Sequence, residues 1–113
     1  MTQTTSDKIR WTSADLELFP ESDWKRYEII DGELLVTRAP HLGHQNSAGL
    51  TYARLLIWSE ETGLGQPFLA PGVVFSDADD VIPDVVWVQK DRLPNIVDES
   101  GHLTEAPDLV GRF

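Results

Sequence analysis

A single aspartate ahead of an apolar run is the strongest candidate for chemistry in this sequence. Asp84 follows Pro83 and opens the run Val85–Val88, which predicts a strand buried on both faces. A carboxylate at the rigid edge of such a strand can hold Mg²⁺ together with a second carboxylate, waters and substrate oxygens. The bound ion would polarise a phosphodiester and help to make hydroxide from water. The alternative is that Asp84 is an ordinary turn residue after a proline.

Two glutamates flank a predicted hairpin turn and are further candidates. Glu28 lies near the end of the first strand of the hairpin, and Glu33 opens the second strand. Both side chains could project towards a cleft. The alternative is that they form cross-strand polar pairs on a face exposed to solvent.

Histidines and aspartates elsewhere give weaker indications of a metal site. His41 and His44 are three residues apart at the start of a predicted helix, where they could bind a metal or contact a phosphate. No third ligand follows at a diagnostic spacing, so a hydrogen-bonded histidine is the alternative. Asp77, Asp79 and Asp80 lack the glycine and the closing glutamate of a calcium loop, which favours a solvated turn.

The elements that must position these residues follow from local patterns. Thr12 and Asp15 match a capping box before a short helix at 13–19. Asp31-Gly32, between two strand-like runs, predicts a two-residue hairpin over 26–37. Apolar residues recur at helical spacing in two stripes over 44–61, which predicts a helix buried over much of its circumference and ended by Gly63. The remaining expected elements are strands at 66–70, 73–76 and 85–88, a helical turn within 90–96, a polar loop at 97–106 and the start of a strand at 107–110.

These elements predict an α+β fold, with a mixed β-sheet flanked by helices and an incomplete last strand. The 113 residues suffice for one modest domain, and the absence of cysteine excludes disulfides and thiolate metal sites. A formal charge of −10 argues against a generic DNA-binding module. The polar residues 1–10 lack the apolar segment of a signal peptide, and no run is long enough to cross a membrane. We therefore expect a cytoplasmic protein.

The succession of motifs resembles one protein family. The segments are WTSADLELFP, RYEIIDGELLV, HLGHQ after a proline, FLAPGVVF, IPDVVWV, RL and EAPDLV. In this order they are similar to the Uma-two family of restriction endonucleases in the PD-(D/E)XK nuclease superfamily. The resemblance implies a restriction-endonuclease-like fold, DNA as substrate and Mg²⁺ or Mn²⁺ as cofactor. It also implies that Asp84 is the first metal ligand, and that Glu28, Glu33 and His44 correspond to common features of the family.

The end of the sequence departs from the family pattern. After APDLV the family usually continues with V-E-(V/I/L)-S-P-S, which supplies the second metal-binding carboxylate, and then with a segment that carries a lysine. Here Gly111 and Arg112 stand where Val and Glu would be. We therefore expect a disordered leader over 1–10, followed by the N-terminal part of a single domain over 11–113. A truncated gene, a shortened product and a genuine short paralogue all fit.

Two functions follow from that reading. The first is a metal-dependent endonuclease by ancestry, with this chain inactive because the second carboxylate and the lysine are missing. The second is a non-catalytic fragment or interaction module. An incomplete sheet would expose an edge strand and apolar surface, so such a fragment should dimerise, aggregate or be partly molten, and a homodimer could form through the sheet edge.

Overall fold

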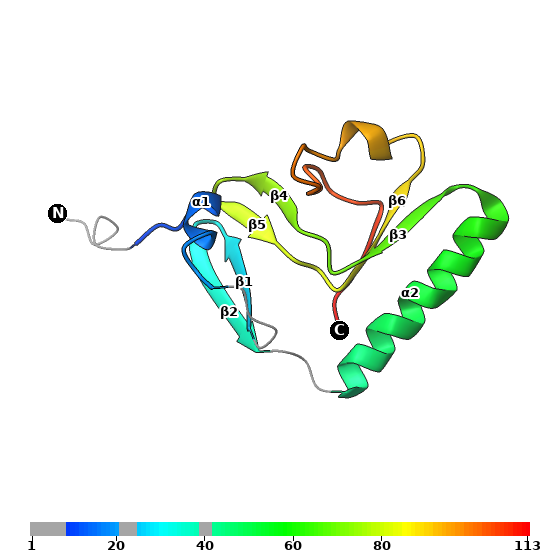
Figure 1. The fold of residues 1–113 in the computed structure, drawn as a ribbon, viewed down its shortest axis with the longest axis horizontal. Coiled ribbons are helices and arrows are strands. Elements are labelled where there is room, and N and C mark those ends of the chain that lie inside the picture. The colour runs from blue at the N-terminus through cyan, green and yellow to red at the C-terminus, as the bar shows by residue number, and fades with distance from the viewer. Residues whose placement is uncertain (1–8, 21–24, 39–41) are drawn as a thin grey trace.

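The computed structural model describes residues 9–20, 25–38 and 42–113. The α+β class expected from the sequence is confirmed, and the strands divide between two antiparallel sheets (Figure 1). Within the described part of the chain, every helix is too short or too polar to span a bilayer. In chain order the elements are α1 (Ser13–Leu16), β1 (Lys25–Ile30), β2 (Glu33–Arg38), α2 (Leu42–Thr62), β3 (Gly65–Leu69), β4 (Val73–Ser76), β5 (Asp79–Val81), β6 (Val85–Gln89), the 3-10 turn η2 (Leu93–Asn95) and β7 (Leu109–Gly111).

The first sheet has the order β2-β1-β5-β4 and is built on the predicted hairpin. Asp31 and Gly32 have φ of 50° and 75°, the positive values that a type I′ turn needs at both central residues. The resulting register places Ile30 opposite Glu33 and Arg26 opposite Thr37. The short helix before the hairpin has the predicted capping box, but it ends at Leu16 and not at Phe19.

Part of the acidic segment beside the hairpin is a strand. The predicted turn is present at Asp77, and the prediction was wrong for Asp79 and Asp80. Asp79–Val81 forms β5, which pairs with β4 and places Asp80 opposite Ile29 of β1. The carboxylate of Asp79 accepts a hydrogen bond from the amide of Asp31 at 2.8 Å. Sequence patterns assign such a segment to a turn, because aspartate disfavours strands unless a specific partner holds it.

The second sheet has the order β3-β6-β7, with β6 in the centre. Val85, Val86 and Val88 of β6 are buried, as the apolar run predicted for a strand covered on both faces. β7 is a three-residue edge strand that begins at Leu109. All pairings between named strands are antiparallel. In the described residues, an isolated bridge between Val73 and Leu103 is parallel.

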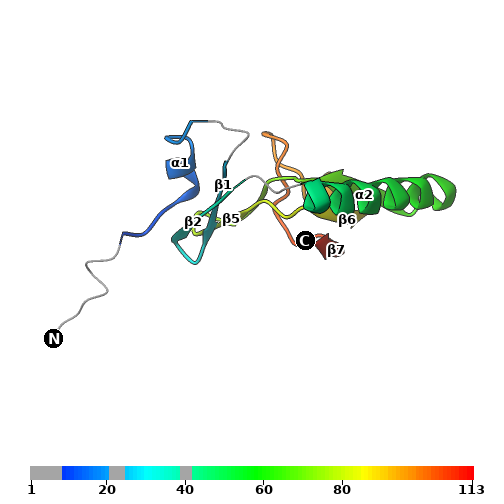
Figure 2. The same ribbon diagram turned by 90° about the horizontal axis from the view of Figure 1, so that it is seen from below.

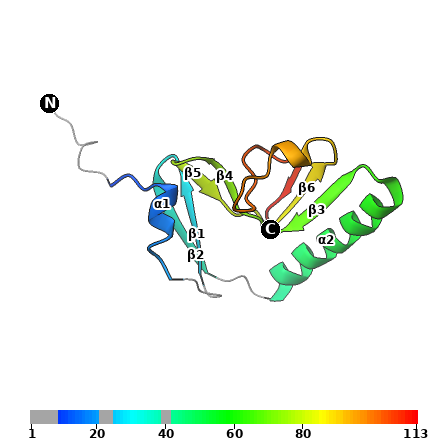
Figure 3. The ribbon, with the colours of Figure 1, turned by 45° about the horizontal axis from the view of Figure 1, so that its top comes forward.

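Helix α2 packs against the second sheet with one of its sides only. Figures 1 and 3 place it at the opposite end of the molecule from the hairpin. Gly63, with φ of 68°, follows its end as predicted. The prediction that α2 would be buried over much of its circumference was wrong, because Leu50, Ile57 and Trp58 are largely exposed. The strand neighbours of α2 are β3 and β6, and in the view from below the helix runs alongside β6, away from the hairpin (Figure 2). Apolar spacing shows which side chains could be buried, but burial also needs a neighbouring element on each side.

The hydrophobic core lies between the two sheets and the long loop after η2. Val73, Val86, Val88, Ile96 and Leu103 form one buried cluster. The segment 97–106 was expected to be a polar loop. It instead contributes Leu103, which is bridged to both Val73 and Val97. These contacts fix the strands on either side of Asp84, so the site is built on a rigid frame.

Candidate functional site

The backbone of Asp84 is held between two strands of the second sheet. Its amide donates to the carbonyl of Gly111 at 3.2 Å, and its carbonyl accepts from the amide of Ala70 at 2.8 Å. Pro83 precedes it outside the ladder, where a missing N–H is tolerated. Asp84 is 8% exposed. The expected rigid strand edge beside the core is therefore present.

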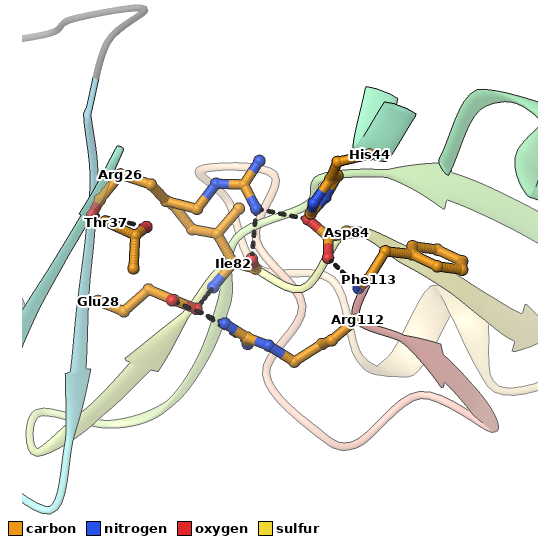
Figure 4. Close-up of polar contacts among 8 residues, drawn as sticks. All are labelled: Arg26, Glu28, Thr37, His44, Ile82, Asp84, Arg112 and Phe113. Atoms are coloured by element: carbon orange, nitrogen blue, oxygen red, sulfur yellow. Dashed lines mark hydrogen bonds and ion pairs between the residues drawn. The ribbon is translucent and has the colours of Figure 1, made fainter. Parts of the chain in front are cut away.

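Both carboxylate oxygens of Asp84 have partners (Figure 4). Oδ1 accepts a hydrogen bond from Nη1 of Arg26 at 2.8 Å. Oδ2 accepts one from the amide of Phe113, also at 2.8 Å. Nε2 of His44 lies 3.2 Å from Oδ1. One charged donor and one backbone donor therefore satisfy this carboxylate within the chain.

The partners of Asp84 favour its ionised form. Burial alone would raise the pKa of the carboxyl group, because it penalises the charged state. The hydrogen bonds from the Phe113 amide and from Arg26, together with His44, outweigh burial and lower the pKa from its ordinary value of 3.8. Asp84 is therefore an anion at neutral pH.

Glu28 is the second buried carboxylate of the site. It is 2% exposed, so the alternative of a polar pair on a solvent face was wrong. Arg112 donates to Oε1 at 2.8 Å and to Oε2 at 3.1 Å, a two-pronged ion pair. Oε2 also accepts from the amide of Ile82 at 2.7 Å. The hydrogen bond to Glu28 raises the pKa of the Arg112 guanidinium above its ordinary value.

Ile82 connects the two ion pairs. Nη1 of Arg26 donates to the carbonyl of Ile82 at 3.2 Å as well as to Asp84. Because the amide of the same residue donates to Glu28, the two carboxylates and two guanidinium groups form one continuous network (Figure 4). The network contains two negative and two positive charges, so it is neutral before His44 is counted.

His44 lies near the start of α2, beside Asp84. Its Nε2 atom is buried and has no aligned hydrogen-bond partner in the described residues, although Asp84 is close. The ring contacts Phe113 edge-on, with centroids 6.2 Å apart. His41, the other histidine of the predicted pair, lies outside the described residues.

Glu33 is not brought to the site. It is exposed at the turn end of β2, opposite Ile30, whereas Arg26 and Thr37 pair at the other end of the hairpin. Sequence reasoning missed Arg26 and Arg112. Arg26 could have been found, because residues two apart in a strand point to the same face and it precedes Glu28 by two. The pairing of Arg112 with Glu28 joins residues 84 positions apart and has no local pattern.

A small pocket of about 250 Å³ opens over the network. Its lining residues are Arg26, Thr37, Arg38, His44, Asp84, Arg112 and Phe113. A larger hollow of about 1040 Å³ lies beside α1 and the hairpin, and Asp84 does not line it. The smaller pocket is the relevant one, because the buried carboxylate and the basic groups converge there.

This arrangement does not fit a divalent ion. Residues 9–20, 25–38 and 42–113 contain no group of three or more His, Asp or Glu side chains placed to hold a metal. Arg26 and the Phe113 amide engage Asp84, and Arg112 engages Glu28. Mg²⁺ needs carboxylate oxygens that are free to approach it at close range. As folded here, the site is complete without a cation.

Comparisons with known proteins bear on the origin of this site. Residues 13–111 match the model of the Uma2 family, described as "Putative restriction endonuclease". The crystal structure of a "putative nuclease belonging to DUF820" from Anabaena variabilis matches with a TM-score of 0.66 and 21% identity. The match covers 86% of this chain and 54% of that one, so the chain spans about half the length of its structural neighbour. Comparison with curated proteins gives no match.

Proposed function

Because this chain belongs to the Uma2 family, we propose that the family domain hydrolyses DNA phosphodiesters with a divalent metal at Asp84, and that residues 1–113 alone are inactive. The proposed cofactor of the family domain is Mg²⁺ or Mn²⁺, whereas the site of this chain does not fit either ion. Glu28 and His44 are the proposed helpers, since both share the network or pocket with Asp84. Glu33 lies too far along the hairpin for the proposal to include it.

The single observation that carries the proposed inactivity is that both carboxylate oxygens of Asp84 already accept hydrogen bonds. A metal-binding carboxylate of a nuclease must present free oxygen atoms to the ion and, through it, to the phosphate. In this chain the two oxygens accept from Arg26 and from the Phe113 amide at 2.8 Å each. The fold therefore supports the nuclease family, while the electrostatics of the site support an inactive chain.

The test is plasmid cleavage by the 113-residue chain with Mg²⁺ or Mn²⁺. We expect no nicking above the level of buffer alone. Asp84→Asn is the matched variant, because it keeps the shape of the side chain and removes its charge. Cleavage by the wild-type chain that disappears in Asp84→Asn would refute inactivity and place the metal centre within these residues. Equal cleavage by both proteins would identify a contaminating nuclease.

The alternative function, a self-associating module, is favoured by a different observation. β7 is an edge strand, and Leu109, Val110 and Phe113 around it are each about half exposed. Edge strands with apolar side chains pair readily with another chain. We propose a homodimer formed through this edge.

Light scattering after size-exclusion chromatography tests the dimer. We expect the mass of a dimer for the wild-type chain and of a monomer for Val110→Lys, which puts a charge on the edge strand. The control is Val36→Lys, an exposed position on β2 of the other sheet, and it should leave the dimer intact. A monomeric wild-type chain at every concentration would refute this alternative.

A further inference from the structure

The two ion pairs of the site cross between the two sheets. Arg26 and Glu28 lie two apart in β1, so both point to the same face of the hairpin. Asp84 and Arg112 belong to the second sheet, at the entry to β6 and directly after β7. Arg26 pairs with Asp84, and Arg112 pairs with Glu28. Each side therefore supplies one cation and one anion, and the pairs are reciprocal (Figure 4).

Burial makes these pairs necessary. Glu28 is 2% exposed and Asp84 is 8% exposed. An isolated buried carboxylate is strongly disfavoured unless a partner cation and hydrogen bonds compensate it. The shortest contact in each pair is 2.8 Å. The folded chain therefore has to keep a positive charge beside each carboxylate.

The side chain of Arg112 is the more accessible of the two guanidinium groups. It is 50% exposed, against 27% for Arg26. Arg112 also experiences the charge of Asp84 in addition to its contact with Glu28. Removing Arg112 would leave two buried carboxylates against one arginine, a net negative charge in a low-dielectric setting.

We propose that Arg26 and Arg112 are built-in cations which take the place of a metal ion at Glu28 and Asp84 and fasten the hairpin to the second sheet. In the folded chain a divalent ion would have to displace a guanidinium group that already satisfies a carboxylate. This inference concerns ion binding and stability. It rests on the same engaged carboxylates as the proposed inactivity, but it is read out by ion binding and unfolding and not by cleavage, so the two proposals can fail separately.

The first test is the response of thermal unfolding to Mn²⁺. The wild-type chain should show no rise in Tm with Mn²⁺. Arg112→Gln should have a Tm lower by about 10 °C, since an unpaired buried charge is among the most destabilising changes. Mn²⁺ should then restore part of that loss, and the rescue should disappear when Glu28→Gln is added.

The matched control is Arg10→Gln. Arg10 pairs with Asp31 at 3.4 Å, but the two side chains are 61% and 91% exposed. Exposed pairs contribute little to stability. Arg10→Gln should therefore change neither the Tm nor its response to Mn²⁺.

A double-mutant cycle keeps the inference testable if Arg112→Gln fails to fold. Glu28→Gln with Arg112→Gln replaces the ion pair with two neutral amides of similar shape. If Arg112 neutralises Glu28, the double variant should be more stable than the sum of the single losses predicts. It should also fold if Arg112→Gln does not. Strictly additive losses, or Mn²⁺ binding by the wild-type chain that depends on Asp84, would overturn the proposal.

Discussion

Replacing Asp84 with asparagine should destabilise the chain at neutral pH and much less at acidic pH. Asparagine keeps the size of the side chain, and its oxygen can still accept from the Phe113 amide. It loses the charge that pairs with Arg26 at 2.8 Å. The hydrogen bond to a charged group is worth about 1.5–3 kcal/mol. Because Arg26 is 27% exposed and can be partly resolvated, we expect a loss of about 2 kcal/mol at pH 7.

The pH dependence follows from the direction of the pKa shift. The folded-state pKa of Asp84 is lowered, so the unfolded chain binds the proton more tightly than the folded chain does. The stabilisation by Asp84 is therefore fully present above its ordinary pKa of 3.8 and is lost as the pH falls through the lower folded value. The difference between wild type and Asp84→Asn should therefore shrink as the pH falls below the unfolded pKa and through the lower folded value.

Urea unfolding followed by tryptophan fluorescence measures this difference at a series of pH values. Asp91→Asn removes an equal charge from an exposed position and serves as the control, so it should have no effect of this size at any pH. The reasoning would be refuted if Asp84→Asn were as harmless as Asp91→Asn at pH 7. It would also be refuted if its cost were the same at pH 3 as at pH 7.

Two further predictions concern the second sheet. Gly65→Ala should cost about 1–3 kcal/mol in urea unfolding, because its Cβ would lie 2.3 Å from the Trp87 ring and 2.4 Å from a backbone oxygen. Gly49→Ala in α2, where a Cβ meets nothing within 4 Å, should instead stabilise the chain by up to about 1 kcal/mol. A Gly49→Ala variant less stable than Gly65→Ala would contradict this reasoning. Ser59→Ala should cost about 1–3 kcal/mol, since it removes the acceptor of the Trp87 indole N–H at 2.9 Å. The emission of Trp87 should change in that variant, and unchanged stability and emission would rule out the contact.

Local elements of this fold could be predicted because their causes are local. The turn at Asp31-Gly32 needs two positive φ values, and few residue pairs other than Asp-Gly supply them. The end of α2 at Gly63 follows from the same freedom of glycine. The partners of β5 and the exposed side of α2 could not be predicted in this way. Both depend on which element lies opposite, and residue spacing within one segment carries no such information.

The sequence analysis named both carboxylates of the candidate site and missed both of its arginines. Asp84 stood out because a proline and an apolar run fix its place at a strand edge. Glu28 was named with it, and the structure places both in one network. Arg112 was noted in the sequence only because it stands where the family pattern has a glutamate, directly after β7. Through its long-range pairing with Glu28, Arg112 supplies a positive charge to the site.

The assignment of these arginines also bears on DNA binding. Affinity for DNA comes largely from lysine and arginine side chains that neutralise phosphates. The chain has nine Lys and Arg residues against nineteen Asp and Glu residues. Arg26 and Arg112 are engaged by Asp84 and Glu28, so the pocket over the network offers less free positive charge than its lining suggests. A phosphate that entered it would compete with two buried carboxylates for the same guanidinium groups. The proposed replacement of a metal by these arginines would therefore also weaken the attraction for a phosphodiester, and both effects agree with the proposed inactivity.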